Sequence, residues 1–209
     1  RTLVPGAGHL VHMPAHIYMR TGRYADASEA NVEAIATDRA YFAKAEPSLE
    51  YRMMYFPHNI DFLWSAASME GRSAEALRAA REMQAATPVD MVRQMPDMEG
   101  GLVAPLFVLA RFGKWDDILA EPAPPADLPF ATASRHFARG LAYARKNDLG
   151  KADAELVALR AVAGTTPPER TIQIVNRAKD ILDVETEVLA GEIAIDAKRP
   201  EDAVKHLEK

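Results

Sequence analysis

Small and apolar residues recur along most of this chain at the three- and four-residue spacing that places them on one face of a helix. Between about Ala25 and Thr37, for example, they occupy positions 27, 30, 34 and 35. A longer stretch of the same period runs from Pro168 to about Ala197 and predicts one long helix, or two helices broken near Asp180. The pattern predicts an all-α protein.

Tight turns divide the predicted helices into pairs. Gly22 ends the first helix and can adopt the left-handed backbone of such a turn, because it has no Cβ. An aromatic residue, Tyr24, follows two positions later, and Ala27 follows three after that. A small residue there lets the second helix approach the first closely. The same kind of turn, with other residues at some of its positions, recurs at Gly71, Gly113, Asn147 and Lys198.

This pattern of helices and turns resembles the tetratricopeptide repeat, a 34-residue unit of two antiparallel helices. The turn positions Gly113 and Asn147 are 147 − 113 = 34 residues apart, which is the period of that family. The resemblance implies an α-α superhelix, a tetratricopeptide-like solenoid of about five helix-turn-helix units with insertions, spanning residues 1–209 as a single domain. It also implies an interaction scaffold that binds a peptide or protein segment in a concave groove lined by the first helices.

Two local features depart from a regular repeat. Pro14 lies inside the first helix, where it removes a backbone hydrogen bond and predicts a kink. Residues 38–57 are rich in aromatic residues and methionine and exceed the length that a repeat connection needs. We expect them to form an insertion packed over one face of the array.

Composition and charge narrow the classes of partner. The chain has 209 residues, 48% of them hydrophobic, and a formal charge of −5 with no cluster of lysine and arginine, which argues against nucleic acid. The absence of cysteine excludes disulfides, thiolate metal sites and cysteine nucleophiles. No apolar run is long enough for a membrane span.

The chain begins without methionine and ends inside a predicted helix, so we expect it to be a piece of a longer protein. The missing part of its own chain is therefore one candidate for the groove. We expect a cytoplasmic location, and leave a periplasmic one open because a leading segment could be missing.

The histidines are concentrated where the resemblance places the groove. Its groove-facing positions in the first unit fall on His9, His12, His16, Met19 and Arg20. Those in the second unit include His58, Asp61 and Ser65. Four of the six histidines thus lie on neighbouring first helices, where they can contact a bound peptide carboxylate.

The same histidines support an alternative function, metal binding or metal-dependent chemistry, including hydrolysis. His12 and His16 have the i, i+4 spacing that lets two imidazoles share one ion, and His58 or Asp61 can complete the set. Zinc and copper are the divalent metals that suit such ligands. No HExxH, GxSxG or phosphate-loop motif is present, so the sequence leaves open whether the protein is an enzyme.

The remaining ionisable residues are interpreted as structural. His136 and His206 fall outside the groove positions and are predicted to be structural or exposed. The acidic run of Glu185, Glu187, Glu192 and Asp196 is predicted to form a solvated helix face.

Overall fold

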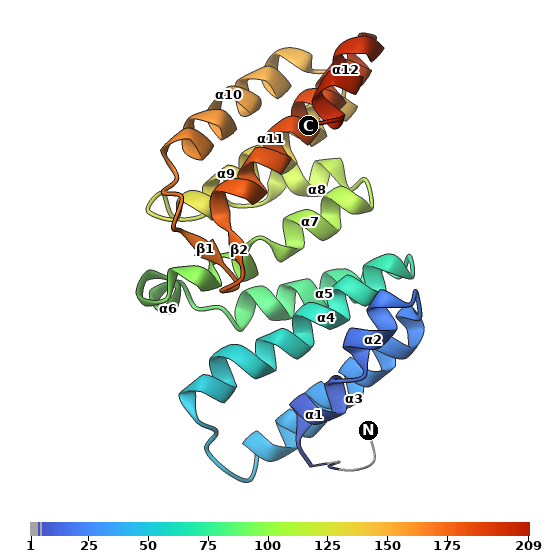
Figure 1. Cartoon of the computed structure of the whole chain (residues 1–209), viewed down its shortest axis with the longest axis vertical. Helices are drawn as coiled ribbons and strands as arrows, with labels where there is room; N and C mark the ends of the chain where they lie inside the picture. Colours follow the sequence, from blue (N-terminus) through green and yellow to red (C-terminus); the bar gives the residue numbers. More distant parts are fainter. Residues whose placement is uncertain (1–3, 5) are drawn as a thin grey trace. The chain divides into compact units, whose positions relative to one another are not determined.

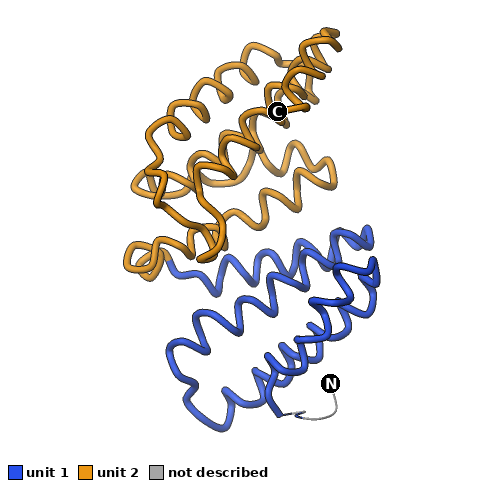
Figure 2. The backbone as a smooth tube through the Cα atoms, viewed as in Figure 1, with its two compact units in different colours: residues 1–88 blue, residues 89–209 orange. Residues whose placement is uncertain are grey.

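The computed structural model describes Val4 and residues 6–209, and about 74% of the chain is helical. The predicted mostly helical class is therefore confirmed. Backbone contacts divide the chain into two compact units, residues 1–88 and residues 89–209 (Figure 2). Within the described part of the chain, no helix combines the length and the apolar character that crossing a membrane requires.

The first unit consists of two short helices followed by three long ones, and one π-helical turn lies between the first and the second of the long helices (Figure 1). In chain order these are α1 (Gly8–His12), α2 (Ala15–Arg20), α3 (Tyr24–Phe42), η1 (Tyr51–Tyr55), α4 (Phe56–Met69) and α5 (Ser73–Ala85). Helix α3 packs against α1, α2 and α4, and α1 also contacts α4. Segments far apart in the sequence therefore meet where α1 crosses α4.

The kink predicted at Pro14 is present as a break between α1 and α2. Proline has no N–H, so the chain restarts its helix with Ile17 donating to the Pro14 carbonyl oxygen at 3.0 Å. His12 and His16 consequently belong to different short helices.

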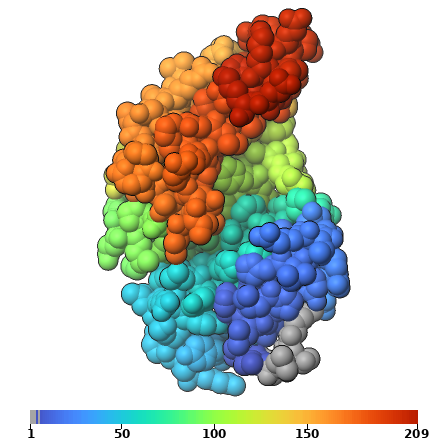
Figure 3. All heavy atoms as spheres, viewed as in Figure 1, coloured from blue at the N-terminus to red at the C-terminus, as the bar shows by residue number. Residues whose placement is uncertain are grey.

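The second unit contains the remaining elements, packed around α9 and α11. They are α6 (Val89–Gln94), the 3₁₀-helix η2 (Pro96–Leu102), α7 (Ala104–Arg111), α8 (Trp115–Ala120), α9 (Pro129–Arg145), α10 (Leu149–Thr165), β1 (Thr171–Ile172), β2 (Asn176–Arg177), α11 (Ala178–Asp196) and α12 (Pro200–Leu207). Helix α9 packs against α8, α10 and α11, and α11 packs against α12. The orange and red side chains of α11 and α12 cover much of the face of this unit seen in Figure 3.

All five predicted turn positions have left-handed backbone. Their φ angles are 74° at Gly22, 79° at Gly71, 66° at Gly113, 61° at Asn147 and 61° at Lys198. In each turn the next residue donates its N–H to the carbonyl five residues back, as Arg23 does to Tyr18 at 2.9 Å. This is the Schellman pattern of helix ends. The residues five positions after the turns are all buried, namely Ala27, Ala76, Ile118, Ala152 and Ala203.

The long helix predicted from Pro168 is wrong at its beginning. Residues 171–177 form an antiparallel hairpin in which Thr171 pairs with Arg177, and α11 starts only at Ala178. The turn forces left-handed backbone on two residues other than glycine, and it is held because Gln173 donates its N–H to the Asp97 carbonyl oxygen at 2.8 Å. These contacts to η2 are not visible in helical periodicity.

The insertion predicted over residues 38–57 is largely helical. Helix α3 continues to Phe42, and the chain is helical again before the π-helical turn η1, so the non-helical connection covers only residues 43–48. A partly buried contact ties η1 to α3, since the Tyr51 hydroxyl donates to Asp38 Oδ1 at 2.7 Å.

Candidate metal centre

Three histidines from three helices of the first unit direct ring nitrogens at one another. Nε2 of His12, on α1, lies 3.0 Å from Nε2 of His16, on α2. Nε2 of His58, on α4, lies 3.4 Å from that same His16 nitrogen. The three ligand atoms lie within 4.8 Å of one another. Zinc–nitrogen bonds of about 2.0–2.1 Å in tetrahedral geometry separate two ligand nitrogens by about 3.3 Å, so both short distances suit one shared ion.

A buried asparagine fixes the tautomer of His12. Asn31 Nδ2 donates to the Ala27 carbonyl oxygen at 2.7 Å, which turns its Oδ1 toward His12 Nδ1, 2.7 Å away. His12 therefore donates from Nδ1 and keeps its lone pair on Nε2, the atom that faces His16. An oxygen that accepts from the ring nitrogen not bound to the metal orients metal-binding imidazoles in this way.

At most one proton is available to the two short contacts among the three nitrogens. Since His12 Nε2 holds a lone pair, the 3.0 Å contact is a hydrogen bond only if His16 Nε2 carries a proton. That protonated nitrogen has no lone pair left with which to accept from His58, 3.4 Å away. A bound cation would instead accept the lone pairs of all three nitrogens.

The cluster favours neutral imidazoles. The pKa of His12 is lowered to about 3, mainly by burial and also by the neighbouring histidines, while the Asn31 hydrogen bond opposes the shift. Burial also lowers the pKa of His58 to about 4, with His16 and His9 adding to the shift. The pKa of His16 is lowered mainly by burial too. The unprotonated ring is the form that binds metals.

Phe62 forms an apolar wall of the cluster. Its ring centroid lies 4.7 Å from that of His12, 4.6 Å from that of His16 and 4.8 Å from that of His58. Phe62 follows His58 by four residues, one turn later on α4. A hydrocarbon wall limits competing hydrogen bonds and keeps the local dielectric low.

His9 lies beside these three histidines without joining them. Its ring centroid is 5.3 Å from that of His12 and 5.7 Å from that of His58. Its backbone N–H donates to the Tyr51 hydroxyl at 3.1 Å, and burial is the main cause that lowers the pKa of its ring. The ring of His9 therefore lies near the group, but only His12, His16 and His58 bring their ligand nitrogens together.

A buried carboxylate, Asp38, holds together the helices that carry the cluster. It is 1% exposed and accepts from the Tyr51 hydroxyl at 2.7 Å and from Asn59 Nδ2 at 2.8 Å. Burial raises the pKa of Asp38 and raises that of Tyr51 to about 12. Gly8 also approaches this carboxylate so closely that a Cβ there would collide with it. Asp38 thus contacts both Gly8, at the start of α1, and Asn59, the residue after His58.

The other predicted site residues lie outside the cluster. Asp61 is not among the converging ligand atoms of the described residues, and its Oδ1 accepts from Trp64 Nε1 at 2.8 Å. Met19 packs against a core cluster of small residues around Ala27. Arg20 is exposed and Ser65 is partly buried. The structure therefore brings together three of the four predicted metal ligands.

Sequence reasoning missed the residues that support the histidines, namely Asn31, Asp38, Tyr51 and Asn59. Their only signal is polarity at positions where the helical pattern requires burial, and all but Tyr51 are fully buried. A buried polar residue normally has a specific partner. The identity of that partner depends on contacts up to 42 residues apart.

The remaining histidines have partners in the second unit, as predicted for structural residues. His136 Nδ1 lies 2.6 Å from Glu155, and His206 Nδ1 lies 2.6 Å from Glu187. The predicted solvated acidic face of α11 is wrong at Glu185, which is 5% exposed.

The chain matches no protein-family model, no curated protein and no solved structure at a significant level. The resemblance to tetratricopeptide repeats consequently stays a prediction from the sequence.

Proposed function

We propose that the first unit binds one divalent transition-metal ion through Nε2 of His12, His16 and His58. The observation that carries this proposal is the approach of three imidazole nitrogens, two pairs of them at 3.0 and 3.4 Å, with the lone pair of His12 directed at the others. Nitrogen ligands without a carboxylate favour zinc or copper over magnesium or calcium.

Three histidine ligands leave a fourth coordination position for water. Zinc sites of this composition are catalytic rather than structural, because the bound water becomes acidic enough to act as a nucleophile near neutral pH. Within this chain, Asn31 orients one ligand, Asp38 holds the helices in register, and Phe62 screens one side. Metal-dependent hydrolysis is the reaction class that such an arrangement serves.

Cobalt(II) titration of the metal-free full chain tests the proposal, because tetrahedral cobalt gives intense visible absorption. We expect one cobalt ion to bind and zinc to displace it. His16→Ala removes the nitrogen common to both short contacts and should weaken binding at least about 100-fold. His136→Ala removes a histidine that pairs with Glu155 in the other unit and should leave binding unchanged. Equal affinity in both variants, or no tetrahedral spectrum in the wild type, would overturn the proposal.

The repeat architecture belongs to the same proposal. Five left-handed turns with the same hydrogen-bond pattern, each followed five positions later by a buried residue, support a tetratricopeptide-like solenoid. Peptide binding in a first-helix groove stays a prediction of the resemblance. The histidines assigned to that groove are the residues that the metal proposal uses.

A further inference from the structure

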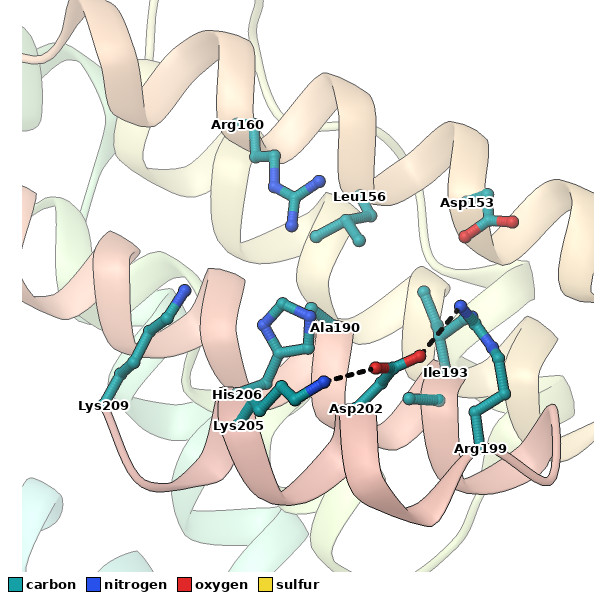
Figure 4. A pocket seen from close by; sticks show the side chains of 11 residues that line it. Asp153, Leu156, Arg160, Ala190, Ile193, Arg199, Asp202, Lys205, His206 and Lys209 are labelled. Carbon is teal, nitrogen blue, oxygen red and sulfur yellow. Dashed lines mark hydrogen bonds and ion pairs between the residues drawn. The ribbon is translucent and has the colours of Figure 1, made fainter.

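A groove of about 460 Å³ lies within the second unit, between α10 and α12, with α11 beneath it (Figure 4). Its apolar lining consists of Leu156, Ala190, Ile193 and Ala194. These four residues are all nearly buried, so the groove offers a narrow apolar floor. Contacts at its charged rim must therefore supply most of its specificity.

Charged side chains of both signs surround this floor. Four lysines and arginines line the groove against two carboxylates, and a third carboxylate, Glu187, which is not part of the lining, pairs with Lys209 and His206. The four cations are Arg160, Arg199, Lys205 and Lys209. Such a rim favours a ligand that presents charges of both signs.

Two charged groups of the rim lack a partner. Asp202 already lies 3.2 Å from Lys205 and 3.6 Å from Arg199. By contrast, neither Arg160 nor Asp153 makes an ion pair with any residue that the structure describes. Both belong to α10, and they carry opposite charges.

The spacing of these two groups matches that of a helix face. Asp153, Leu156 and Arg160 stand at positions i, i+3 and i+7, so the two charges are separated by about 10 Å of helical rise with the leucine between them. Figure 4 shows the three in a row along α10, with Arg160 over His206 and Asp153 at the end nearer Arg199. A second helix that offers acidic, aliphatic and basic side chains at the same spacing complements this row.

We propose that this groove binds an amphipathic helix of a partner protein, antiparallel to α10, with an acidic residue facing Arg160, an aliphatic one facing Leu156 and a basic one facing Asp153. In this direction the acidic residue lies toward the N-terminus of the bound helix and the basic residue toward its C-terminus, which the helix dipole favours. The site is separate from the first-helix groove and does not depend on metal binding. Because the rim is exposed to solvent, the complex is weak and salt-sensitive.

The proposal is tested with two synthetic helical peptides of about 15 residues, a length at which isolated helices become stable. One carries Glu, Leu and Lys at i, i+4 and i+7 on an alanine- and glutamine-rich background, and the other exchanges the Glu and the Lys. Binding to the full chain is followed by fluorescence polarisation at low salt. We expect the first peptide to bind about tenfold more tightly, because two ion pairs become two repulsions in the second.

The double variant Arg160→Glu/Asp153→Lys should invert that preference while its circular dichroism spectrum stays unchanged, since both side chains are exposed. Lys44→Glu, an exposed cation of the first unit, makes a charge change outside the groove and should leave the preference as in the wild type. Equal binding of both peptides, a preference that the double variant does not invert, or binding of neither peptide to the wild type would each overturn the proposal. None of these results bears on cobalt binding.

Discussion

The histidine cluster of the first unit and the buried Glu99 of the second unit have different kinds of partners. In the histidine cluster, three imidazole nitrogens face one another, and their two short contacts have at most one proton between them. In the second unit, the fully buried Glu99 accepts the Ala131 N–H at 2.8 Å and an Arg170 N–H at 2.6 Å. Where the lone pairs of several buried groups point at one another, they indicate a ligand site. Where the lone pairs of a buried group accept from protein donors, the group contributes to the stability of the fold.

The same turn occurs in both units, so the backbone does not explain this difference. Gly22 in the first unit and Asn147 in the second have nearly the same φ and the same hydrogen-bond pattern. What differs is the set of side chains that the paired helices carry on their inner faces. Function on such a scaffold is decided by a few inward positions, and the comparison can be tested at each of them.

The largest expected effect is at the buried ion pair of the second unit. Arg170→Met leaves Glu99 buried without its cationic partner and should destabilise the protein by about 3–5 kcal/mol. The control is Arg93→Met, which removes an exposed ion pair with Asp127 and should give a denaturation midpoint close to that of the wild type. Urea denaturation measures the stability of both variants. Equal losses of stability would contradict the distinction between buried and exposed ion pairs.

Much of the fold was predictable because the turns that end helices are determined by nearby residues. A residue in left-handed backbone, and a buried residue five positions later, are both set within one turn and the start of the next helix. The hairpin at residues 171–177 was not predictable, because it depends on Gln173 bonding to Asp97, 76 residues earlier. Local periodicity contains no information about such a contact.

The candidate site shows the same division. His12, His16 and His58 could be proposed from spacing, because two lie four residues apart and the third lies on the next first helix. Asp61 was the natural fourth ligand by spacing, but it accepts a hydrogen bond from Trp64 within its own helix. The supporting roles of Asn31 and Asp38 depend on how α3 packs against its neighbours, which spacing along the chain does not determine.

The second effect concerns Glu185, the buried acid of α11 that accepts from the Ser134 hydroxyl at 2.9 Å. Burial raises the pKa of Glu185 to about 8, while an unfolded glutamate ionises near 4.5. Between these values the folded chain holds the proton and the unfolded chain does not, so stability falls as the pH rises through this range. Glu185→Gln removes that dependence and should stabilise the protein by roughly 2–4 kcal/mol at pH 8 and little at pH 4.5.

Thermal unfolding at both pH values measures this difference between wild type and variant. Glu192→Gln is the matched control on the same helix, since it removes a partly exposed carboxylate that pairs with Arg145. It should bring no gain in stability at pH 8. Parallel pH profiles for wild type and Glu185→Gln would show that Glu185 is not a protonated buried acid.

The smallest expected effect is in the first unit. It tests whether Asn31 orients the metal ligand His12 or only stabilises the fold. Asn31→Leu removes the acceptor that holds the His12 Nδ1–H, and the affinity for cobalt should fall about 10- to 100-fold. Asn31→Asp keeps an oxygen in that place and should restore most of the affinity, because a carboxylate accepts the same hydrogen bond. The decisive measurement is the pair of titrations alongside the unfolding midpoints of the metal-free proteins. If affinity follows those midpoints in both variants, Asn31 acts through packing alone. If the aspartate variant binds cobalt well whatever its midpoint, Asn31 positions His12 for the ion.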